Sequence, residues 1–263
     1  MHDQNGDINA LAGARPLRTA WVTGASSGIG RALALRLARE GWTVAASARN
    51  GEALAQLAAE MPGSIQAFPL DVTDAEAVAA TFAAIEAAIG PLELAVFNAG
   101  TYTRDAANNF DASAFRTIID VNLMGSAHCL AAVMPAMIAR QAGHIAVVAS
   151  VVGYVGLPGA AAYGASKAAL INMCEALYPE LEAHKVRLTM ICPGFVDTEL
   201  TRRNDFPMPF MISSDEAVDH ILKGLRSRRF EVAFPWKMVL SMKLLRALPA
   251  TLFFAVTRRM MRH

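Results

Sequence analysis

Short apolar runs alternate with longer alanine- and leucine-rich segments along most of this chain. We predict a β-strand at each short run, over residues 19–23, 43–47, 65–70, 94–97, 144–149, 186–191 and 231–233. We predict a helix at each longer segment, over residues 31–40, 52–60, 74–88, 114–139, 162–182 and 215–226. Strands that alternate with helices are typical of βαβ units. The pattern therefore predicts an α/β fold with a doubly wound, Rossmann-type, parallel seven-stranded sheet flanked by helices.

Capping residues and the absence of linkers support one sheet domain. Asp74 is placed to cap the helix that follows it, and Ser213 or Ser214 to cap the helix at 215–226. No linker or internal repeat divides the chain. We therefore expect a flexible leader over 1–16, one sheet domain over 17–234 and an apolar, basic, helical C-terminal extension over 235–263.

Composition narrows the class of protein. The 263 residues are 54% hydrophobic and 18% charged, which excludes intrinsic disorder. Cys129, Cys174 and Cys192 form no CxxC pair, so we expect neither a disulfide framework nor a bound metal. The polar residues 1–15 lack a signal-peptide core, and no run of eighteen uncharged apolar residues predicts a membrane span. These features together predict a cytoplasmic protein.

Positive charge is concentrated at the C-terminus. Residues 221–263 hold ten Lys or Arg and one acid, Glu231, although the whole chain carries only +1. Segments 236–248 and 250–256 are helical in composition and rich in apolar residues. Such helices pack on their own domain or across a subunit interface, which we favour here, or they lie at a membrane surface. Nothing resembles a nucleic-acid-binding module, so we expect no nucleic-acid partner.

A glycine-rich turn joins the first predicted strand to the first predicted helix. There the backbone of Gly24, Gly28 and Gly30 can approach a pyrophosphate, and the helix start supplies amide donors. The spacing is Gly-x3-Gly-x-Gly rather than the commoner GxGxxG. The turn therefore predicts a nucleotide-binding site formed by Gly24, Ser26, Ser27, Gly28, Ile29 and Gly30.

A tyrosine and a lysine share one face of a later predicted helix. Tyr163 and Lys167 stand four residues apart, so their side chains can interact. A phenol has an ordinary pKa of about 10, and a nearby ammonium favours its ionised form. Ser150 ends a predicted strand, on the side where open α/β sheets bind ligands. These three residues predict an acid/base site.

In combination, the motifs resemble the classical short-chain dehydrogenase/reductase family, from about residue 17 to 233. The resemblance is carried by the glycine turn, Asn98-Ala99-Gly100, Ser150, Tyr163-x3-Lys167 and further single positions, namely Asp71, Asn122, Pro193-Gly194 and Thr198. Phe97 stands where the family often has a second Asn. The resemblance implies an NAD(P)-dependent oxidoreductase that acts on CH–OH groups, and a homodimer or homotetramer that pairs through the two long helices.

The resemblance also implies a role for each matched residue. The catalytic residues would be Asn122, Ser150, Tyr163 and Lys167. Tyr163 would exchange a proton with the substrate oxygen, Ser150 would orient that oxygen, and Lys167 would lower the pKa of Tyr163. Asn122 would hold a water that relays protons. Besides the glycine turn, the cofactor would contact Asp71, Val72, Asn98, Ala99, Gly100, Tyr163, Lys167, Pro193, Gly194, Val196 and Thr198.

The end of the second predicted strand favours one cofactor. Dehydrogenases that use NAD place an acid there to bind the ribose, whereas this chain has Ala48 followed by Arg49. A guanidinium can bind a 2′-phosphate through two hydrogen bonds. We therefore predict a preference for NADP(H), with NAD(H) as the alternative. Ser27 stands where many NADP-dependent relatives carry a second basic residue.

The segment after Thr198 is expected to cover the substrate. In the family this segment folds over the substrate, so Phe206, Met208, Phe210 and Met211 would form an apolar lid, or alternatively a subunit contact. The predicted function is hydride transfer between NADP(H) and a carbonyl or secondary alcohol, for which we favour an apolar ketone. Two alternatives are a catalytically silent NADP(H)-binding regulatory protein and a membrane-surface reductase of a lipid-like ketone.

Overall fold

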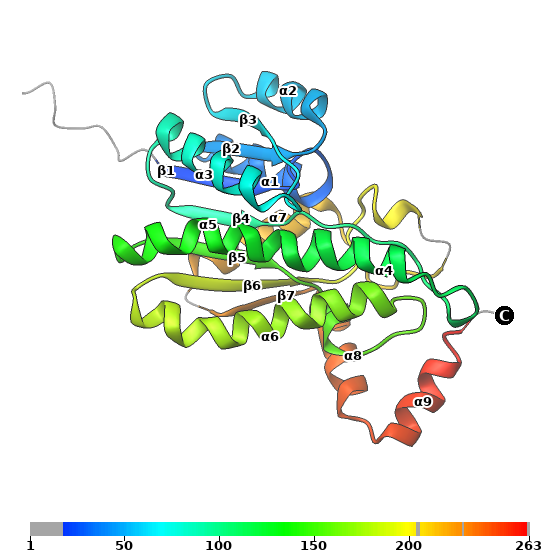
Figure 1. The fold of residues 1–263 in the computed structure, drawn as a ribbon. Coiled ribbons are helices and arrows are strands. Elements are labelled where there is room, and N and C mark those ends of the chain that lie inside the picture. The colour runs from blue at the N-terminus through cyan, green and yellow to red at the C-terminus, as the bar shows by residue number, and fades with distance from the viewer. Residues whose placement is uncertain (1–17, 204–205, 228, 262–263) are drawn as a thin grey trace, which may run out of the picture.

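Seven parallel strands form the centre of the molecule (Figure 1). The computed structural model describes residues 18–203, 206–227 and 229–261. The strands are β1 (Arg18–Thr23), β2 (Trp42–Ala48), β3 (Ile65–Pro69), β4 (Leu94–Phe97), β5 (His144–Val148), β6 (Arg187–Pro193) and β7 (Glu231–Phe234). Their order in the sheet is β3-β2-β1-β4-β5-β6-β7. The predicted doubly wound parallel sheet is confirmed, with strand ends within two residues of those expected.

The helices connect successive strands and cover both faces of the sheet. They are α1 (Gly28–Arg39), α2 (Gly51–Glu60), α3 (Ala75–Ile89), α4 (Ala112–Ile119), α5 (Gly125–Ala139), α6 (Ala161–Ala183), α7 (Ser214–Arg226), α8 (Trp236–Ala247) and α9 (Ala250–Arg258). Asp74 caps α3, as expected. Of the two candidate caps of α7, Ser213 is the one used, and it forms a capping box with Glu216.

The long helix predicted over 114–139 is interrupted. It starts at Ala112, behind the N-cap Asp111, and a π-helical turn over Asp120–Met124 separates α4 from α5. A π-helical turn inserts one residue into the helical repeat, and the residues in it can be as apolar as those of the α-helix around it. The sequence pattern of apolar residues therefore does not reveal the turn. Among the described residues, Ala112–Ala139 is the one helix long and apolar enough to cross a membrane, by length and composition only. Its buried side chains pack in the core.

Two apolar cores lie on opposite faces of the sheet. Alternate residues along each strand point to opposite faces, so Ala20 and Val22 join one core while Trp21 joins the other. Helices α1, α2 and α7 cover the first face, and α3, α5, α6 and α8 cover the second. Both faces are buried, which explains the continuous apolar runs in the strands.

Helices α8 and α9 form an arm beside the sheet (Figure 1). Met238, Met242 and Leu245 of α8 are buried against the second core. Lys243 forms an ion pair of 2.8 Å with Glu231 of β7, which also accepts a hydrogen bond from the Tyr154 hydroxyl. Burial raises the pKa of Glu231, but the hydrogen bonds from Lys243 and Tyr154 outweigh it and lower that pKa overall. Helix α8 therefore packs on its own domain, one of the arrangements that the sequence left open.

Candidate active site

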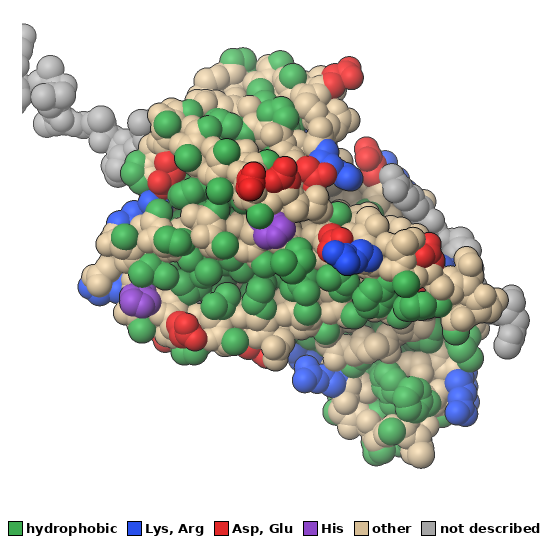
Figure 2. All heavy atoms as spheres, viewed as in Figure 1, with side chains coloured by type: hydrophobic (Ala, Val, Ile, Leu, Met, Phe, Trp, Pro, Cys, Tyr) green, Lys and Arg blue, Asp and Glu red, His purple; other side chains and the backbone are tan. Residues whose placement is uncertain are grey.

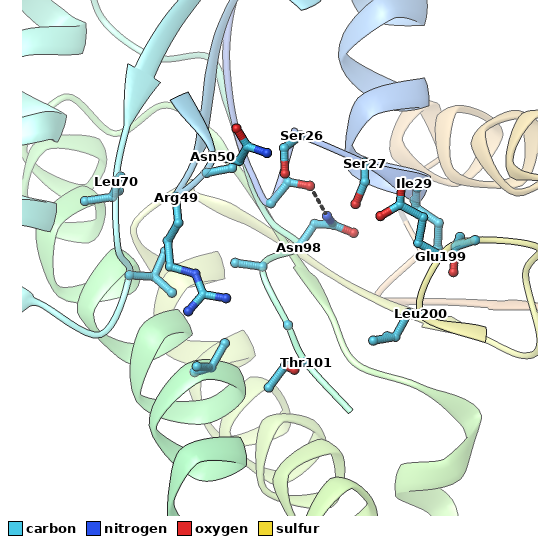
Figure 3. A pocket seen from close by; sticks show the side chains of 18 of the residues that line it. Ser26, Ser27, Ile29, Arg49, Asn50, Leu70, Asn98, Thr101, Glu199 and Leu200 are labelled. Carbon is cyan, nitrogen blue, oxygen red and sulfur yellow. Dashed lines mark hydrogen bonds between the residues drawn. The ribbon is translucent and has the colours of Figure 1, made fainter. Parts of the chain in front are cut away.

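A cavity of about 370 Å³ lies at the carboxyl ends of the central strands. Strands β1 and β4 are neighbours in the sheet, and the connections from them run in opposite directions. Such a switch point opens a crevice where ligands bind in α/β proteins. Figure 3 shows Arg49 and Leu70 on one side of this cavity, Ser27, Ile29 and Leu200 on the other, and Asn98 between them.

The glycine turn follows the cavity wall closely. Gly24 and Gly28 have φ angles of +66° and +52°, which favour glycine. A Cβ at Gly24 would lie 2.8 Å from Cα of Ala99, and one at Gly30 would lie 2.3 Å from the carbonyl oxygen of Gly24. The turn therefore has room only for glycine, and its backbone is exposed to the cavity. This cradle fits the pyrophosphate of a dinucleotide.

The first turn of α1 offers its amide groups to the cavity. Ser27 is the N-cap and makes no side-chain hydrogen bond to this turn, and the turn contains no acidic residue. Ser26, Ser27, Gly28 and Ile29 all line the cavity. Uncapped amides at a helix start attract an anion. The helix start is thus suited to the phosphates of a nucleotide.

Arg49 and Asp71 lie on the rim of this cavity. Asp71 accepts hydrogen bonds from the backbone and hydroxyl of Thr73, at 3.0 and 2.8 Å. These bonds, the backbone one foremost, and the charge of Arg49 hold the pKa of Asp71 below its usual value. Arg49 is exposed and makes no ion pair with the residues that the structure describes. Its guanidinium is available to an anion.

A second cavity of about 600 Å³ adjoins the first, and Leu200 lines both. Ser150 and Tyr163 lie in its wall, and most of the remaining lining is apolar. Tyr102 packs edge-on against Tyr163, with ring centroids 5.2 Å apart. A hydroxyl pair at the edge of an apolar hollow can bind the oxygen of a carbonyl compound while its carbon skeleton is held by apolar contacts.

Burial dominates the acid/base properties of Tyr163. It raises the pKa of Tyr163 to about 12, although a hydrogen bond with Ser150 opposes the rise. The Lys167 ammonium lies 5.6 Å from the Tyr163 ring centroid and is not among the groups that lower this pKa. Lys167 therefore does not lower the pKa of Tyr163 in this structure, because Lys167 is itself buried and burial lowers its pKa to about 8. Such a lowering with a nicotinamide nucleotide bound stays a prediction.

Lys167 and Asn122 are held by hydrogen bonds inside the protein. The Lys167 ammonium donates to the carbonyl of Val148 at 2.8 Å. Asn122, fully buried in the π-helical turn, accepts from the amide of Thr101 at 2.7 Å and donates to its carbonyl and to the hydroxyl of Ser166, each at 3.0 Å. The Asn122 side chain thus fixes the loop after β4. That Asn122 also holds a water stays a prediction.

The two cavities bring together most of the residues that the sequence predicted. The first is lined by Gly24, Ser26, Ser27, Gly28, Ile29, Arg49, Asp71, Val72, Asn98, Ala99, Gly100 and Thr198. Ser150, Tyr163, Gly194, Phe206 and Phe210 line the second. Predicted residues that line neither are Gly30, Asn122, Lys167, Pro193, Val196, Met208 and Met211.

The expected lid is only partly correct. Phe206 and Phe210 reach the second cavity with Pro207 and Pro209, but Met208 and Met211 do not, and Met211 is 46% exposed. The prolines keep this segment irregular. In an irregular segment, apolar character alone does not predict which side chains reach the cavity.

Several lining residues were not predicted from the sequence. The arm contributes Met238, Ser241, Met242, Arg259 and Met260 to the second cavity. The spacing of Met238 and Met242, one helical turn apart, was an available signal for a shared face. No sequence signal placed that face in the same cavity as Tyr163. In the first cavity Asn50, Thr101, Val121, Glu199 and Leu200 were likewise unpredicted.

Fold and site define the class of protein. Residues 18–206 match the family model of short chain dehydrogenases, so the chain belongs to the short-chain dehydrogenase/reductase family of oxidoreductases. It is 43% identical over 246 residues to an uncharacterized oxidoreductase of Myxococcus xanthus strain DK1622, covering 92% of this chain and 97% of that protein. It is 37% identical over 191 residues to the 3-oxoacyl-(acyl-carrier-protein) reductase FabG of Thermotoga maritima, covering 69% of this chain and 75% of that protein.

Solved structures of the family superpose closely on this fold. One is a short-chain dehydrogenase of Burkholderia cenocepacia in complex with NADP, with 30% identity and a TM-score of 0.80 over 92% of this chain and 97% of that one. Another is a short-chain dehydrogenase/reductase of Burkholderia phymatum in complex with NAD, with 25% identity and a TM-score of 0.81. The match covers 87% of this chain and 92% of that one. Structural relatives of this chain thus bind either nucleotide.

Proposed function

We propose that the protein transfers hydride between NADP(H) and an apolar ketone or the corresponding secondary alcohol. One observation carries the proposal. The Ser150 and Tyr163 hydroxyls line the apolar second cavity. This cavity adjoins the first cavity, which has the glycine cradle and the start of a helix in its wall. This arrangement sets a proton donor beside the place where a nicotinamide nucleotide fits.

Each side chain has a part in the proposed reaction. A bound nicotinamide nucleotide would supply or accept the hydride. Tyr163 gives its proton to the carbonyl oxygen in reduction, and the raised pKa of about 12 keeps that proton in place at neutral pH. Ser150 orients the oxygen. Lys167 binds the nicotinamide ribose, and Asn122 acts as a positioning residue through the Thr101 backbone.

Arg49 supports the choice of NADP(H) over NAD(H). It lies on the cavity rim without an ion-pair partner in the described part of the chain, at the end of β2 where an acid would repel a phosphate. Arg49 therefore binds the 2′-phosphate in this proposal. The apolar lining from Phe206, Phe210, Met238 and Met242 supports an apolar substrate over a sugar.

The outer faces of α5 and α6 fit the expected pairing of subunits. Figure 2 shows hydrophobic side chains along both helices on one face of the molecule. An apolar face of this kind suits association of two copies related by a twofold axis. We propose a dimer or tetramer assembled through this face, which analytical ultracentrifugation would test.

Replacing Tyr163 with Phe tests the function. The purified variant should retain NADPH affinity within about twofold but lose about 100- to 10,000-fold in turnover of an apolar ketone, which is the usual contribution of general acid catalysis. Tyr178→Phe is the matched control, because Tyr178 lies on the same helix outside both cavities. Undiminished turnover in Tyr163→Phe would contradict the proposal. NADPH binding without turnover of any carbonyl by the unaltered protein would favour a silent regulatory protein.

A further inference from the structure

Helix α8 presents an apolar surface that the proposed reaction does not use. Trp236, Leu240 and Leu244 recur every four residues and therefore lie along one side of the helix. They are 68%, 49% and 60% exposed, whereas the opposite side of α8 is buried against the domain. Burial of large apolar side chains is favourable by about 1.5–3 kcal/mol each, so an exposed row of this length indicates a binding surface.

Further exposed apolar side chains follow α8 in the arm. Leu252 and Phe254 of α9 are 55% and 53% exposed, and Met260 and Met261 follow them. Figure 2 shows hydrophobic side chains on this arm with Lys or Arg at its edges. We call the exposed apolar residues of the arm and the basic residues around them the arm surface, formed by Trp236, Lys237, Leu240, Leu244, Arg246, Leu252, Phe254, Arg258, Arg259, Met260 and Met261.

The charge around the arm surface has one sign. No Asp or Glu follows Glu231 in the sequence. Lys243 is paired with that residue, but Arg246, Arg258 and Arg259 make no ion pair with the residues described. Lys237 lies 5.8 Å from the ring centroid of Trp236, so an ammonium lies next to an exposed indole. A basic and apolar surface of this kind complements an anionic lipid bilayer, in which apolar side chains enter the interface and cations meet headgroups.

A second copy of the chain complements this surface poorly. Twofold symmetry would place the same surface on both partners, so the arginines of one copy would face those of the other with no acid between them. The face along α5 and α6 is available for pairing instead. We infer that the arm surface docks the protein on the surface of an anionic lipid membrane.

The second cavity opens beside the arm surface. Phe210 and Met260 line this cavity and are also 44% and 47% exposed, so they lie where the cavity meets the outside. Arg259 belongs to both the cavity wall and the arm surface. A docked protein would therefore take its substrate from the bilayer, which makes the substrate a membrane-dissolved apolar ketone. This second step rests on the proposed reductase function, whereas the docking does not.

Vesicle sedimentation tests the docking without any activity measurement. The full chain is mixed with vesicles of phosphatidylcholine alone or of phosphatidylcholine and phosphatidylglycerol. We expect binding to the anionic vesicles that weakens with added salt. Leu240→Gln/Leu244→Gln should weaken it at least about tenfold, and Arg246→Glu/Arg258→Glu at least about tenfold, since each basic residue near an anionic surface contributes about fivefold. Arg39→Glu, an exposed charge reversal on α1, is the control and should bind almost as the unaltered protein does.

The outcomes of the vesicle experiment distinguish membrane docking from other uses of the arm surface. Failure of the unaltered protein to bind anionic vesicles would overturn it, as would equal binding by both double variants. If Leu240→Gln/Leu244→Gln instead lowers the molar mass in light scattering while vesicles bind nothing, the surface is a subunit contact. Unchanged circular dichroism and melting of the variants would show that they are folded, which the exposure of the replaced residues leads us to expect.

A separate activity assay tests the supply of substrate from the bilayer. The substrates are a long-chain alkyl methyl ketone dissolved in anionic vesicles and a short water-soluble ketone. Leu240→Gln/Leu244→Gln should lose at least about tenfold in turnover of the first and remain within twofold on the second, since neither leucine lines the cavities. Equal loss on both ketones would contradict supply from the bilayer. Absence of turnover of either ketone by the unaltered protein would contradict the proposed function and leave the docking result standing.

Discussion

The side-chain amide of Asn98 donates a hydrogen bond of 3.2 Å to the carbonyl of Gly24. The same amide also donates to the carbonyl of Thr23 at 3.1 Å. Asn98 follows β4 and Gly24 follows β1, so one side chain joins the ends of the two strands that flank the switch point. The shape of the cofactor cavity thus depends on a contact between residues far apart in the sequence.

Gly30→Ala should damage this contact. Its Cβ would lie 2.3 Å from the Gly24 carbonyl oxygen and 2.5 Å from Nδ2 of Asn98, so the backbone must shift. We expect a loss of about 1–3 kcal/mol in the free energy of unfolding and a weaker affinity for NADPH. Gly51→Ala is the control, because its Cβ would meet only Pro69 at an ordinary 3.6 Å. Urea unfolding and isothermal titration would measure both, and equal behaviour of the two variants would exclude a special role for Gly30.

Arg49→Ala should reduce the discrimination between NADPH and NADH. Loss of charged hydrogen bonds worth about 1.5–3 kcal/mol should weaken NADPH binding about 10- to 100-fold. NADH, which lacks the 2′-phosphate, should bind within about twofold of its original affinity. Arg39→Ala, which removes an exposed arginine outside the cavity, should change neither affinity. Titration with each nucleotide checks this, and an equal loss for both nucleotides would show that Arg49 does not recognise the phosphate.

Affinity for NADPH should depend on pH through Lys167. Burial lowers the pKa of this lysine to about 8, so the ammonium that we assign to the nicotinamide ribose is lost as pH rises through that value. We expect the affinity to fall as pH rises from about 7 to above 8. Lys167→Arg should abolish the fall, because a guanidinium stays charged. Fluorescence titrations across this range would measure it, and a fall that persists in the variant would assign the titration to another group.

Stability should decrease in mild acid because of His144. Burial, with a contribution from Arg187, lowers the pKa of His144 to about 3, whereas an unfolded histidine has a pKa of about 6.5. Below pH 6.5 the unfolded state therefore binds a proton that the folded state does not. The free energy of unfolding should thus fall by up to about 1.4 kcal/mol per pH unit between about pH 6.5 and 3.

Replacement of His144 isolates that effect. The imidazole lies 2.8 Å from the Thr189 hydroxyl, so His144→Gln keeps a polar partner for it. Urea unfolding at pH 7 and pH 5 should show a smaller decrease for this variant than for the unaltered protein. His184→Gln, at an exposed histidine, should keep the full decrease. If both variants match the unaltered protein, the decrease arises from other groups.

Local patterns predicted the elements and much of the cofactor cavity. Three features could be predicted because each depends only on residues close by in the sequence. They are the strand that precedes Gly24, the helix cap Asp74 and the position of Arg49 after β2. Parallel strands have their carboxyl ends at one edge, so residues that follow different strands meet there. For this reason local patterns predicted the glycine turn and Arg49 at the first cavity, and the family resemblance added Asp71, Val72, Asn98, Ala99, Gly100 and Thr198, whereas five other lining residues were not predicted.

The second cavity depended on contacts that no local pattern specifies. The sequence by itself determined the sheet, the glycine cradle and the residues at the strand ends, because these follow from backbone geometry and apolar periodicity. Tertiary structure alone decided that α8 and the end of α9 line the same cavity as Tyr163 and that Met208 and Met211 do not line it. It also decided that burial raises the pKa of Tyr163. Those features depend on how segments that are distant in the sequence pack together and exclude water. The residues next to a position in the sequence do not specify which distant residues surround it in the fold.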